Sequence, residues 1–393
     1  MGILGVVAFV VGLLFSVMVH EWGHYITAVK FRMKVTEFFL GFGQRIWSFQ
    51  RGETEFGLKA IPAGGYCKIV GMSPQEELSE DDHARAFYKA PVLKKLIVLG
   101  SGALLHFVLG ILFIALLVGG VGLNQSLPNV ESVVPCITTS EKCAATDPIS
   151  PAQLAGIKVG DEIVGVNGSK ATWNDIVKVI RANANREISL IVSTNGEERT
   201  ITVTPHEVTV DGKSWGIIGV QTATGMVREN LPNTVIRTAQ VTSFFFKGSL
   251  QALVSLPTKI PSLVRQTFFG EQRDSNGLVG IVGVARASAQ TAKSGALSLR
   301  EKIATFLLII ASLNIFVGIF NLIPILPLDG GHMAVAFVEA IRRRIARAQG
   351  KPDPGPIDVE KLTPITLVVF VGLSALTLLL LAADIFNPID LNL

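Results

Sequence analysis

The chain has 393 residues, of which 49% are hydrophobic and 17% are charged, and its mean hydropathy is positive. Soluble domains carry about 25% charged residues, so this composition is poor in charge for a soluble protein. The formal net charge is only +4 and no basic run is interleaved with aromatic residues, which argues against a nucleic acid partner.

Four stretches are apolar enough to cross a membrane, which takes about 20 mostly apolar residues. They cover residues 3–29, 96–122, 303–326 and 364–386. The first is too long for the apolar region of a signal peptide and has no basic residue before it, so we expect it to be retained as a span. The pattern predicts a polytopic α-helical membrane protein with four transmembrane helices in the cell membrane.

Basic residues beside the spans predict how the chain crosses the bilayer, because they concentrate on the cytoplasmic side. They cluster between the first two spans and between the last two. Both links are therefore predicted to be cytoplasmic, while both termini and the long segment between the second and third spans are predicted to lie outside. The basic residues concerned are Lys30, Arg32, Lys34, Lys94, Lys95, Arg342, Arg343, Arg344, Arg347, Lys351 and Lys361.

Residues 52–72, between the first two spans, combine turn residues with short apolar–polar alternations. Pro62, Gly64 and Gly65 mark the bends, so we expect a β-loop on the cytoplasmic side. Together with the two spans it makes up the first expected region, residues 1–122.

Residues 123–227 are predicted to form a separate α+β domain outside the membrane. Two strand-like runs flank Asn195–Gly196, which is a strong hairpin signal. The run AGIKVGDEIVGVNG, from Ala155 to Gly168, resembles the core signature of PDZ domains, whose groove between a strand and a helix accepts a peptide as an added strand. Peptide C-termini are therefore candidate ligands; a small α+β domain without a peptide ligand is the alternative.

Two of the three cysteines, Cys136 and Cys143, lie seven residues apart in a polar part of this domain. If the domain is outside the cytoplasm, its oxidising surroundings favour a disulfide between them. Two unrelated thiols are the alternative.

Residues 228–300 are expected to form an amphipathic linker on the outer membrane surface, with Phe244, Phe245 and Phe246 among its apolar contacts. Residues 301–393 then hold the last two spans. A fifth span within the linker is the competing interpretation. We disfavour it because Lys247, Pro257, Lys259, Pro261 and Arg265 interrupt the apolar stretch.

The most informative pattern is His20-Glu21-Trp22-Gly23-His24, in the inner half of the first span. Residues four apart lie on one helix face, so the two histidines can bind the same metal ion. Imidazoles suit zinc, which in catalytic sites keeps three protein ligands and one open position for water, and Glu21 can take a proton from that water. Ionisable residues inside spans are costly and rare, so we favour this interpretation over side chains that merely reach the membrane interface.

Asp329 is the predicted third ligand. It follows the third span in the run from Asn321 to Gly331, NLIPILPLDGG. The first and third spans are predicted to run in the same direction, so their inner ends can lie side by side. The two prolines of this run are expected to break the helix, and the two glycines to allow unusual backbone angles. An ordinary span terminator, with Asp329 at the interface, is the alternative.

With these two motifs the chain resembles the site-2 protease family of intramembrane metalloproteases, especially bacterial regulator-of-sigma-factor proteases with one PDZ domain. HEWGH is similar to the family's HExxH, and NLIPILPLDGG to its N-x-x-P-x-x-x-LDG motif. The run GGYCKIVGM in residues 64–72 resembles its membrane-associated β-loop. The resemblance covers essentially the whole chain.

The resemblance implies regulated intramembrane proteolysis. A single-span substrate, typically an anti-sigma factor, is trimmed outside by another protease and is then cut within its span, which releases a fragment into the cytoplasm. His20, His24 and Asp329 would bind Zn²⁺ and Glu21 would be the base. Asn321 would orient the substrate or stabilise the oxyanion, unless it only caps a helix. We expect the PDZ-like domain to exclude bulky uncut substrates.

Two motifs depart from the family pattern. Its Gly-Pro-x-x-Asn reads Gly102-Ala-Leu-Leu-His106 here, and its GPxGI reads Gly277-Leu-Val-Gly-Ile281. His106 would be a spare ligand, a gate residue or a hydrogen-bonded histidine within the bundle, and we favour the last. Cys67 is expected to be a buried small residue.

Two other classes of function compete with a protease. One is a catalytically inactive membrane scaffold that holds partners through its PDZ domain; the intact Glu21 argues against it. The other is a zinc transporter, which the four spans and the large peptide-binding domain argue against.

Overall fold

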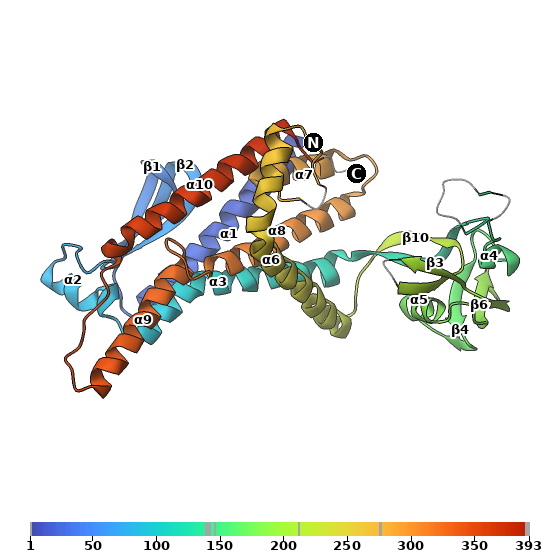
Figure 1. Ribbon diagram of the computed structural model, residues 1–393, viewed down its shortest axis with the longest axis horizontal. Helices are drawn as coiled ribbons and strands as arrows, with labels where there is room; N and C mark the ends of the chain where they lie inside the picture. Colours follow the sequence, from blue (N-terminus) through green and yellow to red (C-terminus); the bar gives the residue numbers. More distant parts are fainter. Residues whose placement is uncertain (1, 138–142, 145–146, 211–212, 275–276, 390–393) are drawn as a thin grey trace. The chain divides into compact units, whose positions relative to one another are not determined.

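The computed structural model describes residues 2–137, 143–144, 147–210, 213–274 and 277–389. These residues divide into two compact units (Figure 1). The first unit consists of Met1–Val121 and Arg228–Leu393, and the second of Gly122–Val227.

In the described part of the chain, four helices are long and apolar enough to cross a membrane, as predicted. They are α1 (Gly2–Lys30), α3 (Val92–Ala115), α8 (Leu299–Asn321) and α10 (Thr363–Phe386). A π-helical segment, η2 (Leu116–Val121), continues α3.

Small residues allow α1 and α3 to approach closely. A Cβ atom added to Gly23 of α1 would lie 2.7 Å from the carbonyl oxygen of Ser101 on α3, so only glycine fits there. α8 packs against both helices. α10 contacts α6 and α7 instead, and the only residues of α10 that are buried are Ala383 and Asp384, near its C-terminal end.

The segment expected as an amphipathic linker forms one helix of 38 residues, α6 (Leu231–Phe268), followed by α7 (Ile281–Lys293). α6 contains Pro257 and Pro261 and crosses α8 in the view of Figure 1. It packs against α3, α8 and α10 and is not among the helices apolar enough to span a membrane.

After α8 the chain turns into α9 (Asp329–Ala348), which packs against α3. A buried ion pair fixes this contact, since Nζ of Lys95 lies 2.7 Å from Oε2 of Glu339. A short 3-10 helix, η3 (Val359–Leu362), leads into α10. Between the first two spans lie the short α2 (Glu80–Arg85) and η1 (Phe87–Lys89).

The β-loop is a long hairpin of β1 (Val35–Arg51) and β2 (Thr54–Ile69). It begins before the expected range, because residues 52–72 contain only its turn and second strand. The hairpin folds back on itself: residues 37–40 pair with residues 65–68 on one side and with residues 55–58 on the other. This places residues 65–68 at an edge of the described sheet.

The second unit is an α+β fold. Its sheet has the strand order β10 (Val220–Val227), β3 (Leu123–Val133), β4 (Glu162–Val166), β6 (Ile188–Thr194), β7 (Glu197–Val203), and β5 (Ser169–Lys170) pairs with β4. β6 and β7 form the predicted hairpin, with positive φ at Asn195 and Gly196. The remaining elements are α4 (Pro151–Leu154), α5 (Trp173–Ala182) and the hairpin of β8 (His206–Val210) and β9 (Lys213–Ile217).

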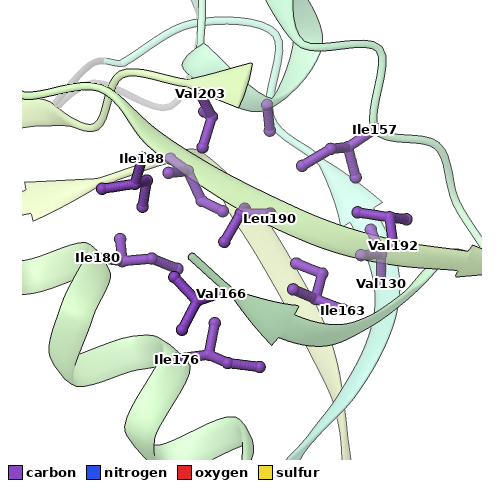
Figure 2. Packing of buried hydrophobic residues seen from close by; sticks show 12 residues of the cluster. Val130, Ile157, Ile163, Val166, Ile176, Ile180, Ile188, Leu190, Val192 and Val203 are labelled. Carbon is purple, nitrogen blue, oxygen red and sulfur yellow. The ribbon is translucent and has the colours of Figure 1, made fainter. Parts of the chain in front are cut away.

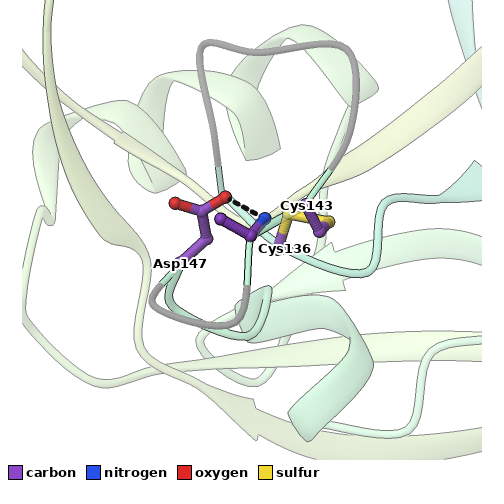
Figure 3. Close-up of a disulfide and its surroundings, with 4 residues drawn as sticks. Cys136, Cys143 and Asp147 are labelled. Atoms are coloured by element: carbon purple, nitrogen blue, oxygen red, sulfur yellow. Dashed lines mark hydrogen bonds between the residues drawn. A yellow bond between two sulfur atoms is a disulfide. The ribbon is translucent and has the colours of Figure 1, made fainter.

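One apolar core holds this unit together. Ile176 and Ile180 of α5 pack onto sheet residues such as Ile163 and Leu190, and all four are buried (Figure 2). A disulfide joins Cys136 and Cys143 (Figure 3), which confirms the favoured reading of this pair.

Candidate metal centre

Two of the predicted ligands are buried one turn apart on α1. Nε2 of His20 and Nε2 of His24 lie 3.1 Å apart, so both imidazoles face one point, as their spacing predicts. α3 provides the wall behind them. A Cβ atom added to Gly102 would lie within 3 Å of both rings, which means that this glycine leaves the space that the imidazoles fill.

Asp329 is brought to the histidines by the turn between α8 and α9. It is the first residue of α9, and its Oδ2 lies 3.2 Å from Nε2 of His20 and 3.4 Å from Nε2 of His24. One expectation about this turn was wrong. Gly330 and Gly331 do not have unusual backbone angles, because both lie in the regular first turn of α9. They are needed for close packing: an added Cβ would lie 2.4 Å from the carbonyl oxygen of Ile323 and from the nitrogen of Leu326, respectively.

The geometry of the three facing atoms fits a tetrahedral metal ion. At metal–ligand distances of 2.0–2.1 Å, neighbouring ligands of a tetrahedral ion are about 3.3 Å apart. The edges of the triangle formed by His20, His24 and Asp329 measure 3.1, 3.2 and 3.4 Å. Oδ2 of Asp329 is buried and has no hydrogen-bond partner among the described residues, as expected for an oxygen reserved for a metal.

A second contact prepares His24 for metal binding. Its Nδ1 lies 2.8 Å from the carbonyl oxygen of Val98, which can only accept, so Nδ1 carries the proton and Nε2 keeps its lone pair. Metal-ligating histidines commonly have such a partner, because it fixes both the tautomer and the ring orientation.

Glu21 lies between the histidines and the β-loop. The backbone N–H of Cys67 on β2 lies near its carboxylate, and a Cβ atom on Gly65 would lie 3.5 Å from its Cγ. Cys67 itself is half-buried, rather than fully buried as expected. Burial and the neighbouring Glu21 carboxylate raise the pKa of the Cys67 thiol, so it stays protonated at neutral pH.

A cavity of about 240 Å³ lies against two of the three candidate ligands, His20 and Asp329. Glu21, Asn321 and His106 also line it. Asn321 is the last residue of α8, and its side-chain amide makes no hydrogen bond to another described residue. A candidate base, an amide donor and two of the candidate metal ligands therefore surround one space.

The two motifs that depart from the family pattern lie in different places. His106 is buried in the bundle and hydrogen-bonded to Asn314, as favoured from the sequence, but it also reaches the cavity. Residues 277–281 lead into α7 and contact the end of α10. A Cβ atom added to Gly280 would lie 2.7 Å from a carboxylate oxygen of Asp384. None of residues 277–281 lines the cavity.

The structure also identifies residues that the sequence analysis missed. The carbonyl of Val98 contacts a ligand through a backbone atom, which every residue type has, so no sequence signal marks it. The role of Gly102 depends on a neighbouring helix, and Asn314 is an isolated polar residue in an apolar span. That isolation is the one signal that would have singled out Asn314.

Comparison with known proteins places these features in a family. A model of peptidase family M50 matches residues 8–352. The zinc metalloprotease Rip1 of Mycobacterium bovis is 35% identical over 419 residues, which cover 100% of this chain and 99% of that protein. Rip1 of Mycolicibacterium smegmatis is 33% identical and the zinc metalloprotease RasP of Geobacillus kaustophilus 25% identical. These alignments cover 99% and 96% of this chain, and 98% and 96% of the respective relatives.

Proposed function

This chain belongs to peptidase family M50 and is a zinc metalloprotease, and from that premise we propose that it cuts peptide bonds inside the membrane. The observation that carries the proposal is the position of the metal-ligand group. His20 and His24 lie on α1 and Asp329 directly follows the turn after α8, and both helices are apolar enough to span a bilayer. A protease site built on such helices is suited to substrates that are themselves in the bilayer.

In the proposed mechanism His20, His24 and Asp329 hold zinc, which when bound supplies a Lewis acid that polarises the carbonyl under attack. The Glu21 carboxylate takes a proton from the attacking water and gives it to the amide nitrogen, so that the C–N bond breaks and a neutral amine leaves. Asn321 donates from its side-chain amide to the carbonyl oxygen while negative charge builds there.

A helical substrate hides its peptide groups in its own hydrogen bonds, so it must unwind before attack. Residues 65–68 of β2 support a way to hold the unwound form. They lie beside Glu21 and, among the described strands, pair only with residues 37–40. An extended substrate segment adds to the open edge as a further strand and is thereby held next to the base.

The second unit is proposed to be the PDZ-like domain, residues 123–227, placed outside the membrane together with both chain termini. Its disulfide suits an oxidising compartment, and β10 is an edge strand to which a peptide end can add. The proposed substrates are single-span proteins such as anti-sigma factors, already trimmed outside. The basic residues near the inner ends of the spans support release of the product into the cytoplasm.

The proposal is tested with purified full-length protein in proteoliposomes. The probe is a single-span peptide with fluorescent labels at both ends and an Asn–Pro pair that weakens the helix at mid-span. Wild type is expected to cut it within the span, whereas Glu21→Gln binds zinc to the same extent and does not cut. Glu197→Gln, on the exposed β6–β7 hairpin, serves as the matched control and is expected to cut like wild type.

The outcomes separate the classes of function. A scaffold leaves the probe intact in wild type as well as in Glu21→Gln. A transporter moves zinc across the vesicle membrane without cutting the probe. Either result, obtained with zinc-loaded protein, would refute the proposed protease function.

A further inference from the structure

His106 does more than pack within the helix bundle, because it also lines the metal cavity. It lies on α3 and is 3% exposed, and its Nδ1 is 2.8 Å from Oδ1 of Asn314 on α8. Its ring also lies 4.9 Å, between centroids, from the ring of His20. One nitrogen thus contacts a neighbouring helix while the ring reaches the wall of the metal cavity.

The direction of each hydrogen bond in this group follows from its partners. Nδ2 of Asn314 lies 2.8 Å from the carbonyl oxygen of Ile310, which can only accept, so the orientation of the Asn314 amide is fixed. Nδ2 also donates to Oγ of Ser16 at 2.9 Å, and that hydroxyl in turn donates to the carbonyl of Gly12. Oδ1 of Asn314 is therefore an acceptor, and Nδ1 of His106 must be the donor.

This fixes the tautomer of His106. Because Nδ1 carries the proton of the neutral ring, Nε2 has a lone pair and is a hydrogen-bond acceptor. The ring nitrogen of His20 that is free of the metal triangle, Nδ1, has no partner among the described residues, so it does not donate to His106. The cavity therefore contains an oriented acceptor that neither the metal ligands nor the proposed base uses.

The roles of the other polar groups in the cavity indicate which substrate group can donate to this acceptor. Asn321 supplies an amide donor, which fits a substrate carbonyl, and the Glu21 carboxylate is assigned to the water proton. An unwound substrate segment also presents backbone N–H groups, and each of these costs free energy when it is buried without an acceptor in an apolar site.

We propose that Nε2 of His106 accepts a hydrogen bond from a backbone N–H of the unwound substrate segment and so positions that segment against the metal centre. The inference rests on the proposed protease function. His106 would then be a substrate-binding residue that departs from the family pattern, which has Asn at the corresponding position.

Two substitutions separate the nitrogens of His106. The amide of Asn reaches about as far as Nδ1 of histidine, and the amide of Gln about as far as Nε2. His106→Asn is therefore expected to keep the bond to Asn314 and to lose the acceptor in the cavity, whereas His106→Gln keeps an acceptor there. In a Glu21→Gln background, which stops turnover, we expect His106→Asn to weaken binding of the labelled single-span probe about fivefold and His106→Gln to weaken it less.

The substrate atom is tested with probes in which one peptide bond, other than the scissile one, is replaced by an ester. Each ester removes a single N–H. We expect one position at which the ester weakens binding to Glu21→Gln about fivefold but has no further effect when His106 is also Asn, as a double-mutant cycle requires for direct partners.

The results distinguish this inference from the function on which it rests. Equal probe affinity in the Asn and Gln variants, or an ester effect that is the same with and without His106, would overturn the inference and leave proteolysis by the wild type intact. A loss of zinc rather than of probe affinity in His106→Asn would also overturn it, because His106 would then support a ligand. Failure of the wild type to cut the probe would refute the proposed function itself.

Discussion

Gly102 on α3 leaves the space that the ring of His20 on α1 occupies: an added Cβ atom would lie 2.5 Å from Cε1 of His20. The same atom would lie 2.6 Å from Nε2 of His24. The rings have little room to move away, because His24 is held at 2.8 Å by the carbonyl of Val98, which also belongs to α3. The arrangement of the candidate metal ligands thus depends on a residue that offers no ligand atom.

Replacing Gly102 with alanine is therefore expected to reduce zinc affinity by about tenfold or more, the size typical of changes just outside a metal's ligands. Gly100→Ala is the matched control, because its added Cβ would meet Met333 at 3.6 Å, an ordinary contact. Zinc affinity is measured by competition with a chelator, and folding by thermal unfolding in detergent. Equal zinc affinities in the two variants would mean that α1 and α3 are not held together as described.

A buried ion pair anchors the C-terminal end of α10. Nη2 of Arg273 lies 2.9 Å from Oδ1 of Asp384, and the side chains are 2% and 1% exposed. Arg273 also donates to the carbonyl of Leu278, and the N–H of Gly283 donates to Asp384. Arg273→Met leaves a buried carboxylate without its cation, which costs about 3–5 kcal/mol. We expect a clear fall in the melting temperature.

Arg265→Met provides the comparison, since the side chains of Arg265 and its partner Glu271 are 53% and 47% exposed and surface pairs contribute about 0–1 kcal/mol. A double variant, Arg273→Met with Asp384→Leu, is expected to be more stable than Arg273→Met alone, because no charge is left unpaired. A double variant that is less stable than the single one would contradict this account.

The core of the candidate metal site was predictable because each of its two motifs is short and contiguous in the sequence. The spacing of His20 and His24 places them on one helix face, and the predicted direction of the spans brings Asp329 to them. The structure places the three residues together, within a triangle that fits a tetrahedral ion. The four apolar helices and the separate α+β unit were predicted for the same reason. Long apolar runs and turn signals can be recognised directly in the sequence.

The remaining features depend on contacts between segments far apart in the sequence. The turn signals lie in residues 52–72, so the sequence predicted the turn and the second strand of the β-loop but not its first strand, β1. β1 is defined by its pairing with two parts of β2, which the sequence pattern does not show. The expected amphipathic linker contains one continuous helix of 38 residues that includes Pro257 and Pro261, and its length was not predicted. The sequence predicted that Gly330 and Gly331 allow unusual backbone angles. In the structure they are needed because a side chain at either position would clash with the backbone of the preceding turn. The acceptor on His106 follows only from the partners of Asn314.

The stability of the second unit is expected to depend on pH through Asp161. Burial alone would raise the pKa of this carboxyl, but hydrogen bonds from the Thr194 hydroxyl, the Lys158 N–H and the Arg199 guanidinium outweigh it and hold the pKa below its ordinary value. A group whose pKa is lower in the folded state stabilises that state above its unfolded pKa, about 3.9 for Asp. The stabilisation is lost as the pH falls through the folded pKa.

Asp161→Asn should thus destabilise residues 122–227, produced alone, by about 1–3 kcal/mol at neutral pH. The difference from wild type should shrink as the pH falls below about 4. Chemical denaturation across this pH range measures both effects. Glu187→Gln, at an exposed position, is the control. A difference that stays constant down to low pH would show that the charge of Asp161 contributes nothing.

The second unit can be removed at a place that the strand register defines. Ser126 on β3 pairs with Thr224 on β10, so residues 127–223 can be replaced by an Asn–Gly turn that closes the remaining ribbon as a hairpin. If this unit excludes uncut substrates, the shortened protein should cut a single-span probe that carries a folded outer domain, which wild type should leave intact. A probe already trimmed outside should be cut by both proteins at similar rates.

The comparison of the two probes is informative because all three candidate metal ligands lie within the first unit. A change that affects only the untrimmed probe must therefore act on access to the site. A shortened protein that binds zinc and is correctly inserted but cuts neither probe would contradict the gating role, because the second unit would then be needed for hydrolysis itself. Equal rejection of the untrimmed probe by both proteins would move the size restriction to the first unit, where α6 runs across α8.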